Sequence, residues 1–399
     1  MSARRKTTVG VIFGGRSVEH DVSVVTGNQV INAFNAERFD VVPIYVTREG
    51  RWHTGEPLRD LKNYNDEIVS FKGVEEVILS PTVQHHGLIL NPISGRLQKS
   101  EIKRLDVVFP TIHGSHGEDG TLQGLLELSD IPYVGCGVLA SSVANDKALT
   151  KDVLRQHGIP VVDGMMFTRR QWLNERDELL EQITNKFPFP IFVKPATLGS
   201  SIGVSRVADT NLLAASIDLA SNFDRRILVE PAVTPNVEIN CSVMGYGDEF
   251  VASVLEQPVS WQEFLTYEEK YLSGGEGMKS AERVIPAPID DALTKKIQQT
   301  AIDAFAAIDG RGITRIDFLA QPDKGTFFLN EINTMPGSLS FYLWRENGMS
   351  PTQVVERLVS LAQDAYADKR RTTYNYQTSL IELTASRGLK GTKGSKSSP

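Results

Sequence analysis

Two stretches in the last third of the chain, GITRIDFLA (residues 312–320) and TFFLNEIN (residues 326–333), are predicted to form neighbouring β-strands around a turn. A hairpin of these strands with a three-residue loop places Asp317 opposite Glu331. Asn333 lies on the same face of the hairpin, because side chains two residues apart in a strand point the same way. The sequence therefore predicts two carboxylates and an amide side by side on one sheet.

Two carboxylates this close repel each other unless a cation lies between them. Two acids and an amide oxygen form a hard-oxygen ligand set, which suits Mg²⁺ better than zinc. The alternative is a solvated polar face on which Arg315, two residues before Asp317, forms an ion pair with it. A two-residue loop in place of Asp323–Gly325 would break the register on which the metal prediction depends.

The composition is that of a globular protein with 399 residues, 41 % hydrophobic residues and a net charge of −7. This length suits two or three domains. The last fourteen residues contain four basic residues and no acid, so the rest of the chain is more acidic still, and we expect no nucleic-acid partner. No apolar run approaches the ~18 residues of a membrane span. The two cysteines cannot form a disulfide framework, so we expect a cytoplasmic protein without a membrane partner.

Strands and helices alternate in the first third of the chain. Strands are predicted at residues 8–13, 39–46 and 105–112, and a helix at 120–128. This alternation predicts an α/β fold with a parallel, doubly wound sheet. The stretch 63–100 is less regular, and it is either an inserted hairpin or a loop.

A second unit is predicted from a strand at 189–193, a glycine-rich loop at 196–203 and a strand at 204–207. Lys194 stands between the first strand and the loop, whose backbone N–H groups could turn toward phosphate oxygens. The alternative is an ordinary hairpin turn. Residues 384–399 are small, basic and nearly without apolar side chains, which predicts a disordered tail.

Three further segments combine polar side chains with glycines. Glu19 follows a strand and a Gly-Gly pair at a helix start, where α/β sheets bind ligands, although an isolated glutamate there is also an ordinary helix-start residue. The loop 111–120 contains His113 and could bring backbone and one histidine to a ligand, or be a polar turn. The segment 264–277 has aromatic, charged and glycine residues, which suggests a mobile lid or a surface loop.

Together and in this order, these segments resemble the D-alanine–D-alanine ligases of the ATP-grasp superfamily. The resemblance runs from about Thr8 to Ala367. Its motifs are GGRSVEHDVS, IHGSHGEDGTLQG, VKPATLGSSIGVS, YEEKY, RIDF and NEINTMPG. It implies a three-domain α/β ATP-grasp fold with a Rossmann-like N-terminal domain. The expected domains are residues 1–140 (N-terminal), 141–234 (central ATP-grasp) and 235–367 (C-terminal ATP-grasp with the lid and metal site), followed by a mostly disordered tail at 368–399.

The resemblance also implies an activity and its site. The family joins two D-alanines into D-alanyl-D-alanine for peptidoglycan, using ATP and Mg²⁺ through an acylphosphate. The matching positions for ATP contacts are Lys147, Lys194, Glu230, Val233, Glu238 and Lys270. Those for catalysis are Glu19, Ser200, Tyr271, Arg315 and Gly337, with Ser200 bonding between Glu19 and Tyr271. Those for substrate are His113, Ser338 and Leu339, and those for two Mg²⁺ ions, or Mn²⁺ in their place, are Asp317, Glu331 and Asn333.

Three departures from the family pattern affect these expectations. Pro231 stands where a lysine often contacts adenine, and the lid after Tyr271 is several residues longer than usual. Ser338-Leu339 follows Gly337 directly, without the usual intervening residues, in the segment that normally binds the acceptor carboxylate. A related ligase with D-lactate, D-serine or another amino acid as acceptor is therefore the main alternative. A non-catalytic nucleotide-binding module would have lost part of the metal triad or Arg315. The family is commonly dimeric, so we expect a homodimer.

Overall fold

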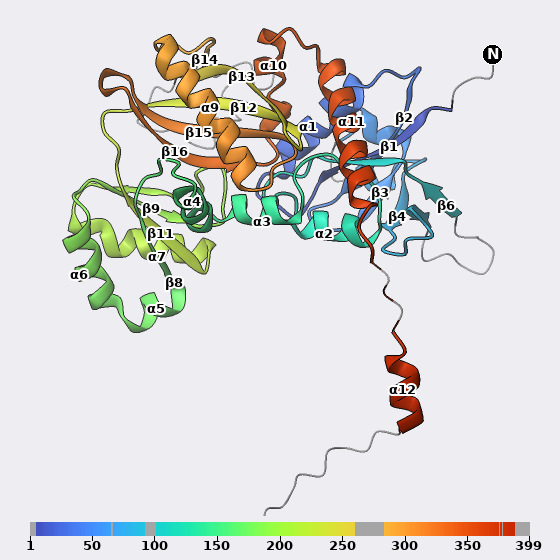
Figure 1. Ribbon diagram of the computed structural model, residues 1–399, viewed down its shortest axis with the longest axis horizontal. Helices are drawn as coiled ribbons and strands as arrows, with labels where there is room; N and C mark the ends of the chain where they lie inside the picture. The colour runs from blue at the N-terminus through green and yellow to red at the C-terminus, as the bar shows by residue number, and fades with distance from the viewer. Residues whose placement is uncertain are drawn as a thin grey trace, which may run out of the picture.

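The computed structural model of the chain describes residues 5–64, 67–91, 101–259, 283–374, 376 and 378–387. Within these residues, the strands form three sheets, of seven, four and five strands, and the sheets follow one another along the sequence (Figure 1). No helix in the described ranges is both long enough and apolar enough to cross a membrane.

The first sheet has the strand order β6-β5-β4-β3-β2-β1-β7. Its strands are β1 (Thr7–Gly14), β2 (Phe39–Val46), β3 (Trp52–Thr54), β4 (Glu75–Leu79), β5 (Gly87–Leu90), β6 (Glu101–Arg104) and β7 (Val107–Pro110). Only β2, β1 and β7 are parallel, and α1 (His20–Ala33) connects β1 to β2. The described parts of the connections from β2 to β5 contain short 3₁₀ turns and no crossover helix, and the strands from β2 to β6 pair antiparallel.

The prediction of a parallel, doubly wound sheet is therefore correct for only three strands of this sheet. The irregular stretch 63–100 supplies β4 and β5, which form a hairpin, so the hairpin alternative is the correct one.

The second sheet has the order β10-β9-β11-β8 and is antiparallel. Its strands are β8 (Met165–Thr168), β9 (Ile191–Pro195), β10 (Ser205–Val207) and β11 (Arg226–Pro231). The helices α5 (Arg169–Asn174), α6 (Arg176–Lys186) and α7 (Leu213–Phe223) pack against it around buried apolar side chains. Strands β9 and β10 enclose the glycine-rich loop, which confirms the predicted strand–loop–strand unit.

The third sheet has the order β14-β13-β12-β15-β16. Its strands are β12 (Val237–Tyr246), β13 (Glu249–Pro258), β14 (Arg283–Val284), β15 (Gly312–Gln321) and β16 (Thr326–Asn333). Helix α9 (Asp291–Ala307) covers one face and buries Ile297, Ala301 and Phe305 completely. The polar residues of the predicted hairpin are left on the other face.

The register of the β15–β16 hairpin agrees with the prediction, but for a different reason. Asp317 pairs with Glu331, and Arg315 pairs with Asn333. The turn, however, has four residues, Pro322–Gly325, because Gln321 and Thr326 still pair, so the predicted three-residue loop is wrong. A β-bulge at Asn330 inserts one extra residue into β16 and restores the predicted pairing beyond it.

The remaining helices connect and cover the sheets. They are α2 (Thr121–Leu128), α3 (Val138–Asn145), α4 (Lys147–Gln156), α10 (Phe341–Glu346), α11 (Pro351–Lys369) and α12 (Leu380–Arg387). Short 3₁₀ turns lie at Glu56–Arg59, Leu61–Asn63, Ile68–Ser70, Thr210–Leu212, Pro322–Lys324 and Gly337–Ser340. Helix α11 buries Val354, Val355 and Leu358 in the core that contains β1 (Figure 1).

Helix α12 corrects the prediction of a disordered tail over its first residues. The segment LIELTASR contains good helix formers and no glycine or proline, and it forms two helical turns. Leu380 and Ile381 are exposed, and Figure 1 shows the helix apart from the rest of the chain. Residues 388–399 of the predicted tail lie outside the described part of the chain.

Candidate active site

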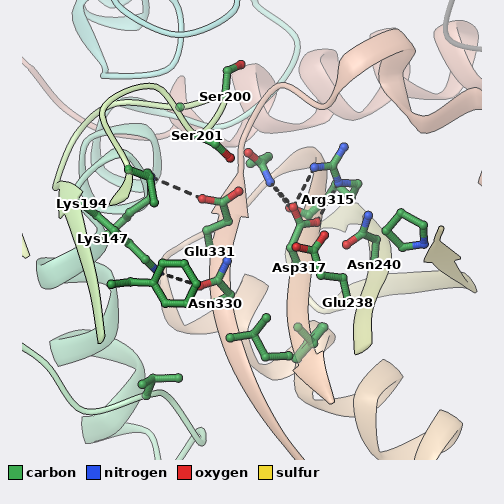
Figure 2. A pocket seen from close by; sticks show the side chains of 18 of the residues that line it. Lys147, Lys194, Ser200, Ser201, Glu238, Asn240, Arg315, Asp317, Asn330 and Glu331 are labelled. Atoms are coloured by element: carbon green, nitrogen blue, oxygen red, sulfur yellow. Dashed lines mark hydrogen bonds and ion pairs between the residues drawn. The ribbon is translucent and has the colours of Figure 1, made fainter. Parts of the chain in front are cut away.

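A polar cavity lies between the three sheets. Its walls come from the segment after β1, the β9–β10 loop, β11 and the open face of β12, β13, β15 and β16. Figure 2 shows how the charged side chains of these elements point toward one another across the cavity. Lys270, Tyr271 and the predicted lid at 264–277 lie outside the described residues.

The predicted metal ligands lie together on the cavity floor. Arg315 donates through Nε and Nη2 to the two oxygens of Asp317, both at 2.7 Å, and Asn333 Nδ2 donates to Asp317 at 3.0 Å. The Glu331 carboxylate forms an ion pair with Lys147, with 3.3 Å between Oε2 and Nζ (Figure 2). The Arg315–Asp317 ion pair that the sequence offered as the alternative is therefore present.

These residues also fit a divalent cation. Asp317, Glu331 and Asn333 supply hard oxygen atoms from adjacent strands, and both carboxylates are already neutralised by basic side chains. A bound Mg²⁺ would take over that neutralising role from Arg315 and Lys147. Within the described ranges, no three His, Cys, Asp or Glu side chains form a metal cluster, so such a site would depend on the Asn333 amide and on a ligand.

A buried cluster of lysines and a glutamate forms the opposite wall. Lys194 Nζ lies 2.7 Å from Glu230 Oε2, and Lys151 forms an ion pair with the other oxygen of the same carboxylate. Glu230 is only 2 % exposed. Burial, together with the charge of Lys147, lowers the pKa of Lys194 to about 8. The charges of Lys147, Lys151, Lys194 and Glu230 therefore act on one another, and a bound phosphate would compete with Glu230 for Lys194.

Lys151 was missed by the sequence reasoning. Asp146 accepts hydrogen bonds from the N–H groups of Ala148 and Leu149 and caps α4, which begins at Lys147. Lys151 lies four residues after Lys147, so both lysines share one face of this helix. That spacing was a signal that could have identified it.

Glu19 joins the N-terminal part of the chain to the glycine-rich loop. It immediately precedes α1, is 7 % exposed, and accepts a hydrogen bond from Ser200 Oγ. This is the contact that the family resemblance implied. A Cβ at Gly114, where φ is +69°, would lie 2.5 Å from Glu19 Oε2, so another residue there would be strained and would displace the Glu19 carboxylate.

Glu118 is a second carboxylate that the sequence reasoning missed. Its oxygens accept from the N–H groups of Gly114, at 2.7 Å, and of Met335, at 2.9 Å. Burial and the charge of Glu19 raise the pKa of Glu118 to about 8. A cation bound near Glu19 and Glu118 would relieve their repulsion.

His113 and Ser338 meet beside the cavity through Thr26 of α1. His113 Nε2 lies 3.0 Å from Thr26 Oγ1, which also accepts the Ser338 N–H at 3.3 Å. Burial lowers the pKa of His113 to about 4, so the imidazole is neutral at pH 7. Gly337 lines the cavity, but His113, Ser338 and Leu339 are not among the described residues that do.

The turn that follows Gly337 is left-handed. Ser338, Leu339 and Ser340 have φ values of 47°, 48° and 49°, although none of them is glycine. All three are buried. In the described part of the chain, no partner is found for the Ser338 and Ser340 hydroxyls. The turn is therefore strained and is held by its surroundings.

The predicted adenine and ribose contacts line the end of the cavity nearest β11. Val233 and Glu238 are there, together with Pro231 and Phe192. Glu238 belongs to β12, and Figure 2 shows it beside Asp317. Pro231 has no side-chain donor, so it offers an apolar surface to this end of the cavity.

Comparison with known proteins matches two family descriptions to the chain. They are "D-ala D-ala ligase N-terminus" over residues 8–136 and "D-ala D-ala ligase C-terminus" over residues 153–360. The D-alanine–D-alanine ligase of Thermosipho africanus is 38 % identical over 377 residues, 94 % of this chain and 98 % of that protein. That of Natranaerobius thermophilus is 39 % identical over 384 residues, 94 % of this chain and 100 % of that protein.

The solved structures to which the chain is similar are ligases as well. The D-alanine-D-alanine ligase from Coxiella burnetii has a TM-score of 0.76 at 28 % identity, covering 96 % of this chain and 99 % of that one. The VanG D-Ala:D-Ser ligase from Enterococcus faecalis also has a TM-score of 0.76, at 30 % identity, covering 90 % of this chain and 100 % of that one.

Proposed function

The chain belongs to the D-alanine–D-alanine ligase family, and we propose that it joins two D-alanines with ATP in the cavity between its three sheets. The relatives that share 37–39 % of its sequence are named for this reaction, and they match over nearly their full length. The product, D-alanyl-D-alanine, is a building block of peptidoglycan.

The chemistry explains why the cavity is so rich in charge. A carboxylate is a weak electrophile, so the γ-phosphoryl group of ATP first moves to the carboxylate of one D-alanine and gives an acylphosphate and ADP. The amine of the second D-alanine then attacks the acyl carbon, phosphate leaves, and the nitrogen loses a proton. Both steps develop negative charge that fixed positive groups can stabilise.

Lys147 and Lys194 are proposed to hold the ATP phosphates. Both ammonium groups face the cavity from elements on the same side, and their present partners, Glu331 and Glu230, are carboxylates that phosphate oxygens can replace. Asp317, Glu331 and Asn333 would hold Mg²⁺ ions, which neutralise charge on the phosphates when bound. Lys270 is proposed to reach the γ-phosphate from the lid, by resemblance to the family.

Glu19 is proposed to bind the ammonium of the first D-alanine, with Glu118 close behind it. Ser200 orients Glu19, and the resemblance adds Tyr271 to this pair. Arg315, fixed by its two bonds to Asp317, and the N–H of Gly337 are proposed to stabilise the oxyanion of the tetrahedral intermediate. A closing lid would keep water from the acylphosphate.

The observation that carries this proposal is the pairing of Asp317 with Glu331, which brings two carboxylates, Arg315 and Lys147 together. We expect Asp317→Ala to abolish D-alanine-dependent phosphate release and the thermal stabilisation that Mg²⁺ and a non-hydrolysable ATP analogue give together. The matched control is Asp323→Ala, an exposed aspartate in the turn of the same hairpin. Normal turnover in Asp317→Ala would contradict the site.

The acceptor is tested directly by a phosphate-release screen of wild-type protein with D-alanine plus D-alanine, D-serine or D-lactate, and by mass spectrometry of the product. We expect D-alanyl-D-alanine as the main product. Preferential formation of another product would contradict the proposed acceptor.

Two further assignments rest on the resemblance and on the sequence. A homodimer is proposed from the family and is measured by light scattering. A reducing cytoplasm is proposed because both cysteines, Cys136 and Cys241, are buried free thiols.

A further inference from the structure

The segment that follows α11 is exposed along its described length. Helix α11 ends at Lys369, which ion pairs with Glu127 and Asp130 hold to the rest of the chain. From Arg370 onward, every residue whose side chain the structure describes is exposed. Figure 1 shows α12 on this segment, apart from the three sheets. The described part of the chain therefore offers α12 no surface to pack against.

Apolar and aromatic side chains stand on this exposed segment. Leu380 and Ile381 are 66 % and 83 % exposed, and Tyr374 and Tyr376 are 69 % and 88 % exposed. Glu382 lies two residues after Leu380, so it points to the other side of the helix. An isolated helix of eight residues is marginal in water, because its few hydrogen bonds do not offset the cost of nucleation. The exposed apolar residues on such a helix indicate a partner outside the chain that covers them.

The same segment is strongly basic. Residues 370–399 contain six basic residues and one acid, a net charge of +5, whereas the whole chain carries −7, so residues 1–369 carry −12. The sequence GLKGTKGSK (residues 388–396) repeats the triplet Gly-x-Lys three times, and Arg387 continues this spacing in the other direction. A basic segment attached to an acidic body points to an anionic partner.

Three kinds of anionic partner attract such a segment: a nucleic acid, an acidic protein and a lipid surface. A lipid surface fits the other side chains as well, without a groove of matching shape. Leucine and isoleucine enter the boundary between headgroups and acyl chains, and tyrosine is typical of the headgroup level. Apolar insertion and polybasic attraction are each weak, and peripheral attachment to a membrane combines two such contributions. The segment contains both within about thirty residues.

We propose that residues 370–399 dock this protein peripherally on a membrane surface with anionic phospholipid headgroups. Leu380 and Ile381 of α12 enter the interface, and the basic residues neutralise lipid charge. The proposal revises the expectation of no membrane partner, which considered only spanning segments, because a peripheral contact needs none. It goes beyond the proposed function and does not depend on it, since binding is measured without substrates.

The position of the segment leaves the active-site cavity open. None of the described residues that line the cavity belongs to α2, α11 or α12. Residues 370–379 connect α11 to α12 and span up to about 33–36 Å when extended. The acidic body is repelled by anionic headgroups, so it stays away from the surface while the segment is bound. We therefore expect the same activity in solution and on vesicles.

The test measures co-sedimentation of the full chain with two kinds of vesicle. One kind is phosphatidylcholine alone, and the other is phosphatidylcholine and phosphatidylglycerol in equal parts. One variant, Leu380→Ser/Ile381→Ser, removes the exposed apolar side chains of α12. A second variant, Lys390→Glu/Lys393→Glu/Lys396→Glu, reverses the charge of the Gly-x-Lys triplets.

Matched controls make the same kinds of change elsewhere on the surface. Leu128→Ser/Leu173→Ser replaces two leucines on α2 and α5 that are 68 % and 73 % exposed. The charge control is Lys295→Glu/Lys296→Glu/Lys324→Glu, which reverses three exposed lysines on α9 and in the turn of the β15–β16 hairpin. None of these five residues is among the described residues that line the cavity.

We expect the wild-type protein to bind the anionic vesicles at least about tenfold more tightly than the neutral ones, and less tightly when NaCl rises from about 0.1 M to about 1 M. One basic residue near an anionic membrane changes affinity about fivefold, so reversal of three lysines should lower it more than about 100-fold. The Leu380→Ser/Ile381→Ser variant should bind about tenfold more weakly or worse. Both controls should bind as wild type, and all variants should release phosphate at the wild-type rate without vesicles.

Hydrogen exchange separates docking of the helix from attraction of the lysines alone. In solution, the backbone amides of residues 380–387 should exchange quickly, because an isolated helix of this length opens readily. On anionic vesicles the same amides should exchange at least about tenfold more slowly, and in Leu380→Ser/Ile381→Ser they should not. Unchanged exchange of these amides in vesicle-bound wild-type protein would contradict the insertion of α12.

Equal binding to both kinds of vesicle would overturn the proposal, as would wild-type binding by a variant that lacks residues 380–399. Tighter binding to poly(U) RNA than to anionic vesicles, unaffected by Leu380→Ser/Ile381→Ser, would overturn it in favour of a nucleic acid. A change in oligomeric state on deletion of the segment, without vesicle binding by the wild type, would overturn it in favour of a second copy. Wild-type protein that binds vesicles but forms no dipeptide would contradict the proposed function alone.

Discussion

Replacing Thr26 with valine tests how the strained turn after Gly337 is held. Thr26 Oγ1 accepts the Ser338 N–H at 3.3 Å and bonds His113 Nε2 at 3.0 Å, and all three groups are buried. Valine has nearly the same shape but no hydroxyl, so it leaves two buried polar groups without a partner. At about 1–3 kcal/mol for each, the loss is roughly 2–6 kcal/mol.

This loss is comparable with the strain that the turn stores. Three consecutive left-handed residues at about 1–2 kcal/mol each amount to roughly 3–6 kcal/mol of backbone strain. Without the Thr26 contact, we therefore expect the turn to relax to another conformation. Gly337, whose N–H is proposed to stabilise the oxyanion, begins this turn. A displacement of about 1 Å can cost about 10²-fold in rate, so we expect kcat to fall about 10- to 100-fold.

The assay is phosphate release at saturating ATP and D-alanine, with a melting curve for each variant. Thr26→Ser is the matched control, because it keeps the hydroxyl and should retain near wild-type kcat. The KM for ATP should stay the same in both variants, since Lys194 and Glu230 are remote from the turn in sequence and lie on another sheet. A Thr26→Val protein with a lower melting temperature but wild-type kcat would refute the link between this contact and catalysis.

Two further predictions concern the lysine cluster and the C-terminal helix. Lys151→Met should raise the KM for ATP, because Glu230 would then compete more strongly with phosphate for Lys194. An unchanged KM for ATP would contradict the idea that Lys151 affects ATP binding by sharing Glu230 with Lys194. Deleting residues 380–399 should leave activity and melting temperature nearly unchanged, because Leu380 and Ile381 are 66 % and 83 % exposed; a drop of several degrees in the melting temperature would show that the segment packs against the rest of the chain.

Much of the site could be predicted because its residues are close in sequence or regularly spaced. Arg315, Asp317, Glu331 and Asn333 lie on two strands of one hairpin, where the period of two places them on one face. The predicted pairing of Asp317 with Glu331 is correct despite the wrong loop length, because the bulge at Asn330 shifts the register by one residue. A bulge of this kind depends on packing around both strands and leaves no reliable mark in the sequence.

Contacts between distant segments could not be predicted in the same way. Glu118 reaches Met335 across 217 positions, and Thr26 reaches Ser338 across 312. Neither Thr26 nor Glu118 stands out from its surroundings in sequence, because a threonine within a helix and a glutamate in a polar loop are ordinary. Their roles appear only when α1 and the loop 111–120 are seen against the turn after Gly337.

The polar face of the β15–β16 hairpin, the strand–loop–strand unit around the glycine-rich loop and the family could be predicted from sequence alone, because they depend on local periodicity and on motifs that are continuous along the chain. The packing of the sheets, in contrast, brings together the charges that meet across the cavity. It gave Glu230 two lysine partners, directed Ser338 and His113 to Thr26, and placed Arg283 and Glu256 beside Arg315. The physical reason is that burial and electrostatic pairing depend on distance in space, and neighbours in space are fixed by how the three sheets pack, which no short stretch of sequence encodes.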